Sequence, residues 1–294
     1  MIADRSNDFG AVVRLFLKEI RIEHTLFALP FAYTGAVLAA RGLPTAWQFA
    51  WITLAVLGAR TAAMAVNRYA DREIDAKNPR TARRAVASGA LAPATMLWAA
   101  GLGIALLLLA AYELNPLCVM LLPLAALGIV AYPYCKRFTW GVHFVLGAVD
   151  GFAPLGAYVA ITGTISWAAV ALFLAVTLWV AGFDIIYALM DRDVDIAQNI
   201  RSLPARFGAE SGRSLPVAMH LVMTALLAAT VALGGVGPIG YAGVALSLGL
   251  TLYEMRLLRD AHDVFALNDR IFTANMIFSI CFLATTLAGM LSAR

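Results

Sequence analysis

Long apolar stretches, separated by short polar segments, run along nearly the whole chain. Nine of them are long enough to cross a bilayer as helices: 25–40, 46–66, 94–112, 116–134, 141–161, 167–190, 215–234, 238–255 and 271–292. Most contain about 18–22 residues, which at 1.5 Å per residue match a hydrocarbon core of about 30 Å. The pattern therefore predicts an all-α integral membrane protein with nine transmembrane helices. The first stretch is the weakest of the nine because it is short and contains Pro30.

Composition supports this interpretation. Hydrophobic residues make up 62% of the 294 residues and charged residues only 14%, whereas a soluble domain is nearer one half apolar and one quarter charged. Three cysteines, Cys118, Cys135 and Cys281, show neither metal-ligand spacing nor a disulfide framework. The first 22 residues are polar and lack the apolar core of a signal peptide. No linker divides the chain, so residues 1–294 are predicted to form a single polytopic membrane domain.

Basic residues are distributed unevenly between alternate loops. They cluster before the first stretch and after every even-numbered stretch, whereas the remaining loops carry Arg41 and few other cations. Because cytoplasmic loops of membrane proteins carry an excess of Lys and Arg, the N-terminus and the charged loops are predicted to face the cytoplasm. Two of these loops, 67–93 and 191–214, are long and rich in both charge signs. Function is therefore expected on the cytoplasmic side of the cell's inner (plasma) membrane.

The first of these loops begins with a polar motif. Asn67, Asp71 and Asp75 are spaced four residues apart, which places their side chains along one helical face. Like charges at this spacing repel each other, and a cation between them removes that cost. Carboxylate and amide oxygens are ligands of Mg²⁺, which usually shares its coordination shell with substrate phosphate. The motif is therefore a candidate site for Mg²⁺ and a diphosphate.

A second acidic segment ends the sixth apolar stretch. Asp184, Tyr187, Asp191 and Asp195 fall within about 60° of one another on one face of a continuous helix, whereas Asp193 points away. Asp184 lies nearly two turns inside the apolar span. An ionisable group at that depth is costly and indicates a functional site.

The two acidic pairs are related by a constant offset. Adding 120 residues to Asp71 and Asp75 gives Asp191 and Asp195, and each pair ends an even-numbered stretch. The repetition predicts two similar helical halves around a central cavity, with the acidic pairs meeting at their interface. A single pair of this kind is most simply a solvated helix end. Two matched pairs favour the binding of metal and diphosphate.

Cations near these motifs extend the candidate site. Lys136 and Arg137 follow the fourth stretch, and fixed cations with Mg²⁺ stabilise the charge that develops on a diphosphate leaving group. Arg60 lies on the face of Asn67 but about 10 Å deeper in the membrane. Two interpretations of Arg60 stay open: an ion pair with Asp150 in the fifth stretch, or binding of a carboxylate on the acceptor.

These motifs resemble those of the UbiA superfamily of intramembrane prenyltransferases, and the resemblance covers essentially the whole chain. The NxxxDxxxD motif, the DxxxD motif and the basic loop of that family are matched by Asn67, Asp71 and Asp75, by Asp191 and Asp195, and by residues 132–137. Within the family, the stretch 78–81 with Arg84 and Gly89 is most similar to 4-hydroxybenzoate polyprenyltransferases. The segment 202–208 is more similar to relatives in the futalosine route to menaquinone.

Two residues depart from the family pattern. Ala85 stands where many members carry proline, and Asp150 is not expected in its helix. The first departure puts little in doubt, whereas the second is consistent with a different acceptor.

The resemblance implies Mg²⁺-dependent transfer of a polyprenyl chain from its diphosphate to an aromatic acid, of the 4-hydroxybenzoate type, in respiratory quinone biosynthesis. The residues that it places in the site are grouped by role. Metal ligands are Asn67, Asp71, Asp75, Asp191 and Asp195; phosphate ligands are Lys136, Arg137, Arg72 and Arg84; further substrate-binding residues are Tyr134, Tyr187, Asp184 and Arg60. The four aspartates of the two pairs and Arg137 are the expected catalytic groups, with Asp191 assisting proton loss. An aromatic face such as Tyr134 or Tyr187 stabilises an allyl cation.

Several alternatives remain open at this stage. They are menaquinone prenylation in the futalosine route, prenyl transfer to haem, chlorophyll or lipid ethers, and, from a different class, secondary transport. A transporter would place its charges at the bilayer midplane, whereas most acidic groups here lie at the cytoplasmic edge. The expected partners are polyprenyl diphosphate, the acceptor and the lipid bilayer, with no role for nucleic acid. Acceptor identity, prenyl chain length and oligomeric state do not follow from the sequence.

Overall fold

The computed structural model describes residues 9–20, 25–260 and 264–293. Within these ranges the chain forms helices and contains no strand, which confirms the all-α prediction. The helices are α1 (Phe9–Glu19), α2 (Thr25–Ala40), α3 (Ala46–Lys77), α4 (Pro93–Leu114), α5 (Pro116–Cys135), α6 (Val142–Thr162), α7 (Trp167–Ala197), α8 (Leu203–Phe207), α9 (Ala209–Leu233), α10 (Gly240–Asp260) and α11 (Val264–Ser292).

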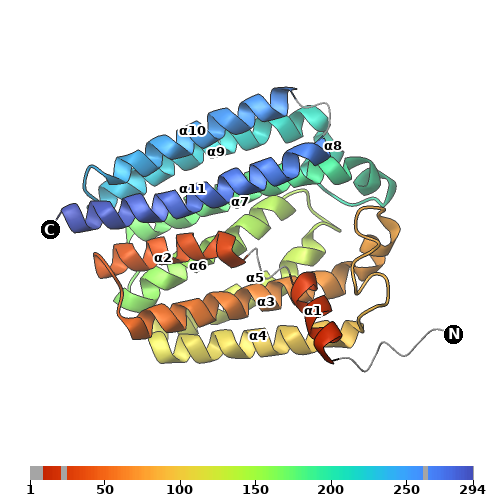
Figure 1. Cartoon of the computed structure of the whole chain (residues 1–294), viewed down its shortest axis with the longest axis horizontal. Coiled ribbons are helices and arrows are strands. Elements are labelled where there is room, and N and C mark those ends of the chain that lie inside the picture. Colours follow the sequence, from red (N-terminus) through yellow and green to blue (C-terminus); the bar gives the residue numbers. More distant parts are fainter. Residues whose placement is uncertain (1–8, 21–24, 261–263, 294) are drawn as a thin grey trace.

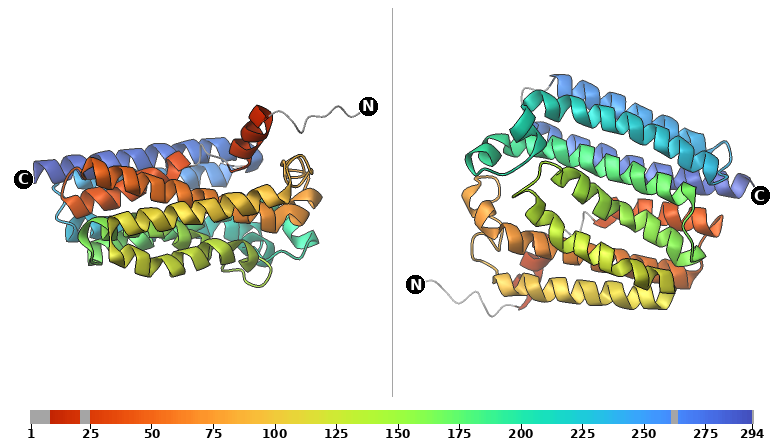
Figure 2. Two further views of the ribbon diagram at one scale, coloured as in Figure 1. Left: turned by 90° about the horizontal axis from the view of Figure 1, so that it is seen from below. Right: turned by 180° about the vertical axis from the view of Figure 1, so that it is seen from behind.

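The long helices lie side by side along a common direction, while α1 projects from the bundle (Figures 1 and 2). The loop between α3 and α4 and the segment around α8 meet at one end of the bundle (Figure 1). That end also holds the C-terminal turns of α3 and α7, which carry the two acidic motifs. The topology therefore brings residues about 120 positions apart to the same end of the molecule.

Seven helices in the described part of the chain are long and apolar enough to cross a membrane: α3, α4, α5, α6, α7, α9 and the segment Asp269–Ser292 of α11. Large apolar side chains such as Trp98, Tyr112 and Met120 are exposed on the outer surface, where lipid would solvate them. The protein is therefore a multi-pass membrane protein. α2, which provides the shorter apolar helix Ala28–Ala40, and α10 fall outside the seven, so the nine-span count stays a prediction.

The long charged loops expected at 67–93 and 191–214 are much shorter than predicted. α3 continues to Lys77 and α7 to Ala197, and α9 already begins at Ala209. The helices continue because cations from elsewhere compensate the acidic side chains that would otherwise repel one another. Asn78, which precedes Pro79, adopts an extended conformation at the end of α3, as residues before proline prefer.

Small residues set the closest helix contacts. A Cβ added to Gly147 of α6 would lie 2.1 Å from the carbonyl oxygen of Thr177 in α7, and one added to Gly35 of α2 would lie 2.1 Å from that of Pro154 in α6. Gly58 of α3 and Gly103 of α4 likewise face each other's backbone. These pairs can approach only because no side chain separates them, a common device in membrane bundles.

A buried polar network crosses the second half of the bundle. His220 of α9 lies 2.6 Å from Glu254 of α10, whose other carboxylate oxygen accepts a hydrogen bond from Asn275 of α11. Asn275 in turn accepts a hydrogen bond from the indole of Trp179 in α7. Satisfied groups of this kind fix the relative positions of buried helices. They hold α7, and with it the second acidic motif, against α9, α10 and α11.

Candidate active site

The first acidic motif is buried at the C-terminal end of α3. Asp71 and Asp75 are only 3% and 6% exposed. The amide nitrogen of Asn67 donates to Asp71 Oδ2 over 2.9 Å, as expected for side chains one helical turn apart. The predicted face therefore forms, and its polar groups point into the protein.

Cations from two other segments compensate these carboxylates. Lys136 Nζ, directly after α5, lies 2.6 Å from Asp71 Oδ2. Arg84 Nη1, in the loop after α3, lies 2.7 Å from Asp75 Oδ2. The backbone N–H of Arg201 donates to the carbonyl of Lys136 and links that lysine to the segment after α7. The structure thus brings two of the four predicted phosphate ligands, Lys136 and Arg84, to the first motif.

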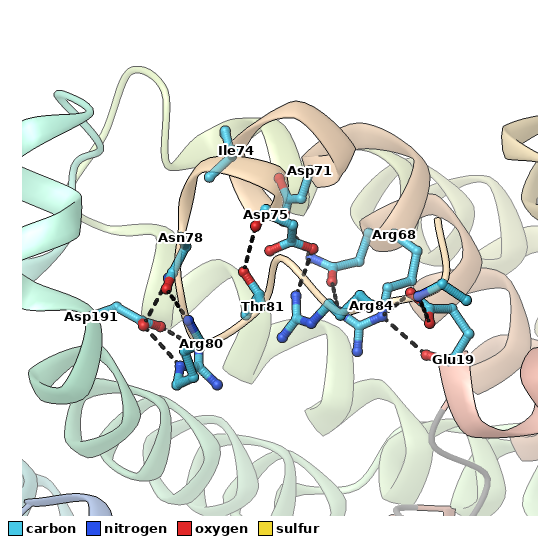
Figure 3. A network of polar contacts seen from close by, with 12 residues as sticks. Glu19, Arg68, Asp71, Ile74, Asp75, Asn78, Arg80, Thr81, Arg84 and Asp191 are labelled. Carbon is cyan, nitrogen blue, oxygen red and sulfur yellow. Dashed lines mark hydrogen bonds and ion pairs between the residues drawn. The ribbon is translucent and has the colours of Figure 1, made fainter. Parts of the chain in front are cut away.

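Asp191 is joined to the first motif by the loop that follows α3 (Figure 3). Asn78 Nδ2 donates to Asp191 Oδ1 over 3.0 Å, and Arg80 Nε donates to the same oxygen over 2.8 Å. Arg80 also forms an ion pair with Asp191 Oδ2. Burial of Arg80 opposes its charge, but its hydrogen bonds to Asp191 and the negative charge of that residue outweigh burial and raise its pKa above the usual value. The Arg80–Asp191 pair therefore stays ionic at physiological pH.

Sequence reasoning did not place Asn78 and Arg80 in the site. Both belong to the 78–81 stretch on which the family resemblance partly rests, immediately after the first motif. Their position beside an acidic helix end was the available signal, but only the fold shows that they contact the second motif.

Two further carboxylates of α7, Asp195 and Asp184, have a serine and a histidine as partners. Ser202 Oγ donates to Asp195 Oδ2 over 2.7 Å, and His143 Nδ1 lies 2.7 Å from Asp184 Oδ2. The backbone N–H of Leu203 donates to His143 Nε2, so that nitrogen carries no proton and Nδ1–H donates to Asp184. His143, to which sequence analysis assigned no role, therefore orients Asp184.

Four predicted residues are turned toward other groups. Arg72 donates to the carbonyl of Tyr69 and to Glu73, and Arg137 donates to the carbonyl of Ala70 over 2.6 Å. The guanidinium of Arg137 lies over the ring of Tyr134, 5.0 Å from its centroid. Tyr187 packs edge-on against Phe183. The structure therefore places these side chains near the motifs but does not direct them at the carboxylates.

A buried ion pair that the sequence did not predict joins α1 to α3 beside the first motif. Glu19, the last residue of α1, lies 3.5 Å from Arg68 Nε, and both side chains are 5% exposed. Arg68 also donates to Asn67 Oδ1, which fixes the orientation of that amide. Glu19 Oε2 accepts the backbone N–H of Ala85, a bond that proline at this position would remove. Alanine at position 85 therefore allows a backbone hydrogen bond to Glu19 that proline could not form.

The substitution Glu19→Gln is expected to destabilise the protein by about 3 kcal/mol, because it removes the carboxylate charge that pairs with the buried guanidinium of Arg68. Thermal unfolding in detergent measures the effect. Glu73→Gln is the matched control, since Glu73 pairs with Arg72 but its side chain is 78% exposed. Equal unfolding midpoints for the two variants would contradict the assignment.

A cavity of about 140 Å³ lies between α3, α4, α5 and α6. Its wall is almost entirely apolar, and Arg60 and Asp150 are the charged residues in it. Arg60 Nη1 lies 3.6 Å from Asp150 Oδ1, so the expected ion pair is present. The wall of the cavity combines residues of α2 to α5 with residues of α6, and the 120-residue offset assigns α6 to the second half of the chain, so both halves contribute to the cavity.

The donor set fits a divalent cation with oxygen ligands. Within the described residues, no three carboxylate, imidazole or thiolate groups already converge as a metal site. The carboxylates of the two motifs nevertheless share one end of the bundle, and Asp71 Oδ1 is buried without a hydrogen-bond partner. Such an orphaned anionic oxygen is costly unless a ligand satisfies it. Hard oxygen donors of this kind suit Mg²⁺.

Comparison with known proteins agrees with this chemistry. The model of the UbiA prenyltransferase family matches residues 28–291. The chain belongs to this family. It is accordingly an enzyme that transfers prenyl groups, and the transporter interpretation is set aside.

Relatives of this UbiA-family enzyme include 4-hydroxybenzoate octaprenyltransferases from Alkalilimnicola ehrlichii and Nitrosospira multiformis. The first is 34% identical and the alignment covers 88% of this chain and 87% of the relative; the second is 36% identical, with 77% and 78% covered. Among solved structures, the apo form of a UbiA homologue from Aeropyrum pernix K1 superposes with a TM-score of 0.82 at 33% identity, covering 92% of this chain and 98% of that one. A UbiA homologue from Archaeoglobus fulgidus, bound to GPP and Mg²⁺, has the same fold, with a TM-score of 0.72 at 18% identity and coverage of 94% and 99%.

Proposed function

We propose that this enzyme transfers a polyprenyl chain from polyprenyl diphosphate to 4-hydroxybenzoate, or a closely related aromatic acid, in respiratory quinone biosynthesis. The observation that carries the proposal is the meeting of two acidic motifs and their cations at the same end of the bundle. The names of the relatives from Alkalilimnicola and Nitrosospira support the choice of acceptor.

The proposed metal ligands are Asp71, Asp75, Asp191 and Asp195, with Asn67. Mg²⁺ held there stabilises negative charge on the diphosphate leaving group. The orphaned oxygen of Asp71 supports the assignment, as does the Mg²⁺ bound to the Archaeoglobus homologue.

The cations of the site are proposed to bind the phosphate oxygens. Lys136 and Arg84 already lie beside the acidic motif, and each can exchange a carboxylate oxygen for a phosphate oxygen with little movement. Arg72 and Arg137 would first have to leave the backbone carbonyls that they now contact. Lys136 and Arg84 are therefore proposed as the principal phosphate ligands.

Loss of diphosphate from C1 of the prenyl chain leaves an allyl cation. The electron-rich ring carbon ortho to the phenol forms the new C–C bond, and the proton on that carbon is transferred to a carboxylate, for which Asp191 is proposed. Tyr134 and Tyr187 are proposed to stabilise the cation with their ring faces. Closure of the two charged segments over the site would exclude water, which would otherwise capture the cation.

Acceptor and prenyl tail are assigned to the interior of the bundle. Arg60 is proposed to bind the acceptor carboxylate, because its buried Nε has no hydrogen-bond partner. Asp184, held by His143, is proposed to contact the substrate. The apolar wall of the cavity suits a hydrocarbon chain, which is most stable away from water.

The enzyme is further proposed to span the inner membrane nine times, with the N-terminus and the active site facing the cytoplasm. The excess of Lys and Arg in alternate loops supports this orientation. Chain 1–294 is proposed to act as one domain.

Product formation by the detergent-solubilised protein tests the proposal. With Mg²⁺ and a radiolabelled polyprenyl diphosphate, 4-hydroxybenzoate is expected to yield a prenylated acid, and chelation of Mg²⁺ is expected to abolish it. A futalosine-pathway aromatic acid serves as the second acceptor, because segment 202–208 resembles relatives of that route. Product with that acid alone would reassign the acceptor, and no product with either would refute the proposed aromatic acceptor class.

A further inference from the structure

The geometry of the Arg60–Asp150 pair leaves hydrogen-bond donors of the arginine free to bind another group. The shortest contact of the pair, 3.6 Å from Arg60 Nη1 to Asp150 Oδ1, is longer than a charge-assisted hydrogen bond. Arg60 Nε is buried and has no hydrogen-bond partner. A guanidinium has five N–H donors in a planar fork, so much of its capacity is unused.

Asp150 lies where a carboxylate ligand of Arg60 would compete with it. Both side chains line the cavity and are 18% exposed, and the rest of the wall offers no other charged group. Asp184 of α7 is close enough to repel Asp150 electrostatically. A second carboxylate entering this apolar cavity therefore meets one cation, Arg60, and one anion, Asp150. Such like-charge repulsion is strong where the surroundings are poorly polarisable.

We propose that Asp150 is a specificity-determining residue: it holds Arg60 when no acceptor is bound and sets the affinity for acidic acceptors by competing for the same guanidinium. The inference rests on the proposed function, since it requires an acceptor that carries a carboxylate. It adds a role for a residue that departs from the family pattern. An acceptor without negative charge gains nothing from Arg60 and is not affected by this competition.

Two substitutions of opposite effect test the proposal. Asp150→Asn removes the competing charge and is expected to lower the KM for 4-hydroxybenzoate about tenfold, which corresponds to one charged hydrogen bond. Asp150→Glu extends the carboxylate toward Arg60, closes the 3.6 Å gap and is expected to raise that KM. Methyl 4-hydroxybenzoate, the same ring without its charge, is expected to show an unchanged KM in both variants.

Controls separate this effect from a general loss of structure. Misfolding would impair both variants in the same direction and with both acceptors, whereas the proposal requires opposite shifts for the acid alone. Asp193→Asn, an exposed aspartate of α7, is the matched control for loss of one carboxylate. Calorimetric titration of 4-hydroxybenzoate gives its dissociation constant independently of turnover and is expected to follow the same order.

Equal changes for the acid and its ester, or no change in either, would overturn the proposal while leaving the proposed function intact. Wild-type protein that prenylates no aromatic acid would instead refute the proposed function, and with it this inference. That result is visible before any variant is compared.

Discussion

Asp71→Asn is expected to lower kcat for prenyl transfer about a thousandfold, an effect comparable to removal of a principal electrostatic stabiliser from an active site. Asp71 is a buried carboxylate whose two oxygens are unequally satisfied. One oxygen contacts Lys136 and Asn67, and the other is buried without a partner. An amide of the same shape removes the charge that Mg²⁺ requires and leaves Lys136 without its counterion.

Product formation as a function of Mg²⁺ concentration measures this loss. The expected signature is a residual rate that excess Mg²⁺ does not restore, in a variant whose thermal unfolding shows that it is folded at the assay temperature. Asp193→Asn is the control, because Asp193 lies two residues from Asp191 on α7 but its side chain is 92% exposed. A decrease of less than tenfold in Asp71→Asn would remove Asp71 from the proposed metal site.

Arg80→Met is expected to lower kcat/KM for polyprenyl diphosphate about a hundredfold. Arg80 contacts both oxygens of Asp191 and thereby fastens the loop after α3 to α7 (Figure 3). That loop also carries Arg84, the partner of Asp75. Without Arg80, only Asn78 joins the loop to Asp191, so the two acidic motifs and the Arg84 guanidinium lose their fixed separation.

The matched variant for this experiment is Arg83→Met. Arg83 belongs to the same loop and has the same charge, but its side chain is exposed. Its effect on kcat/KM is expected to be small, since exposed cations contribute little to a fixed geometry. Similar losses in the two variants would indicate that Arg80 acts only through the overall charge of the loop.

Much of the site followed from sequence because its main feature is periodic. The four-residue spacing of Asn67, Asp71 and Asp75 determines a helical face whatever the rest of the chain does, and that face is present in the structure. The ion pair of Arg60 with Asp150 was one of the two interpretations that the depth of Arg60 suggested, since a buried cation requires an anion.

The partners that complete the site could not be read from spacing. Arg80 reaches Asp191 across 111 residues, and Glu19 reaches Ala85 across 66. The role of His143 depends on the packing of α6 against α7 and on the Leu203 N–H, which donates to its second ring nitrogen. The lining of the cavity could not be predicted from the sequence, because its shape depends on small residues such as Ala59 and Ala63 that carry no distinctive pattern.

The glycine contacts described above have a mechanical consequence for the cavity. The backbones of α3 and α4 are in contact at Gly58 and Gly103, and those of α6 and α7 are in contact at Gly147. Such close backbone contacts are expected to limit the movement of each helix against its neighbour. α5 has no glycine contact of this kind: its Gly128 faces the side chain of Val149, and the helix contains Pro123 and Pro133. Among the helices that line the cavity, α5 is therefore expected to shift most easily. Lys136 directly follows its last residue. A bulkier hydrocarbon tail is therefore expected to displace α5 first, and Lys136 would move with that helix relative to Asp71.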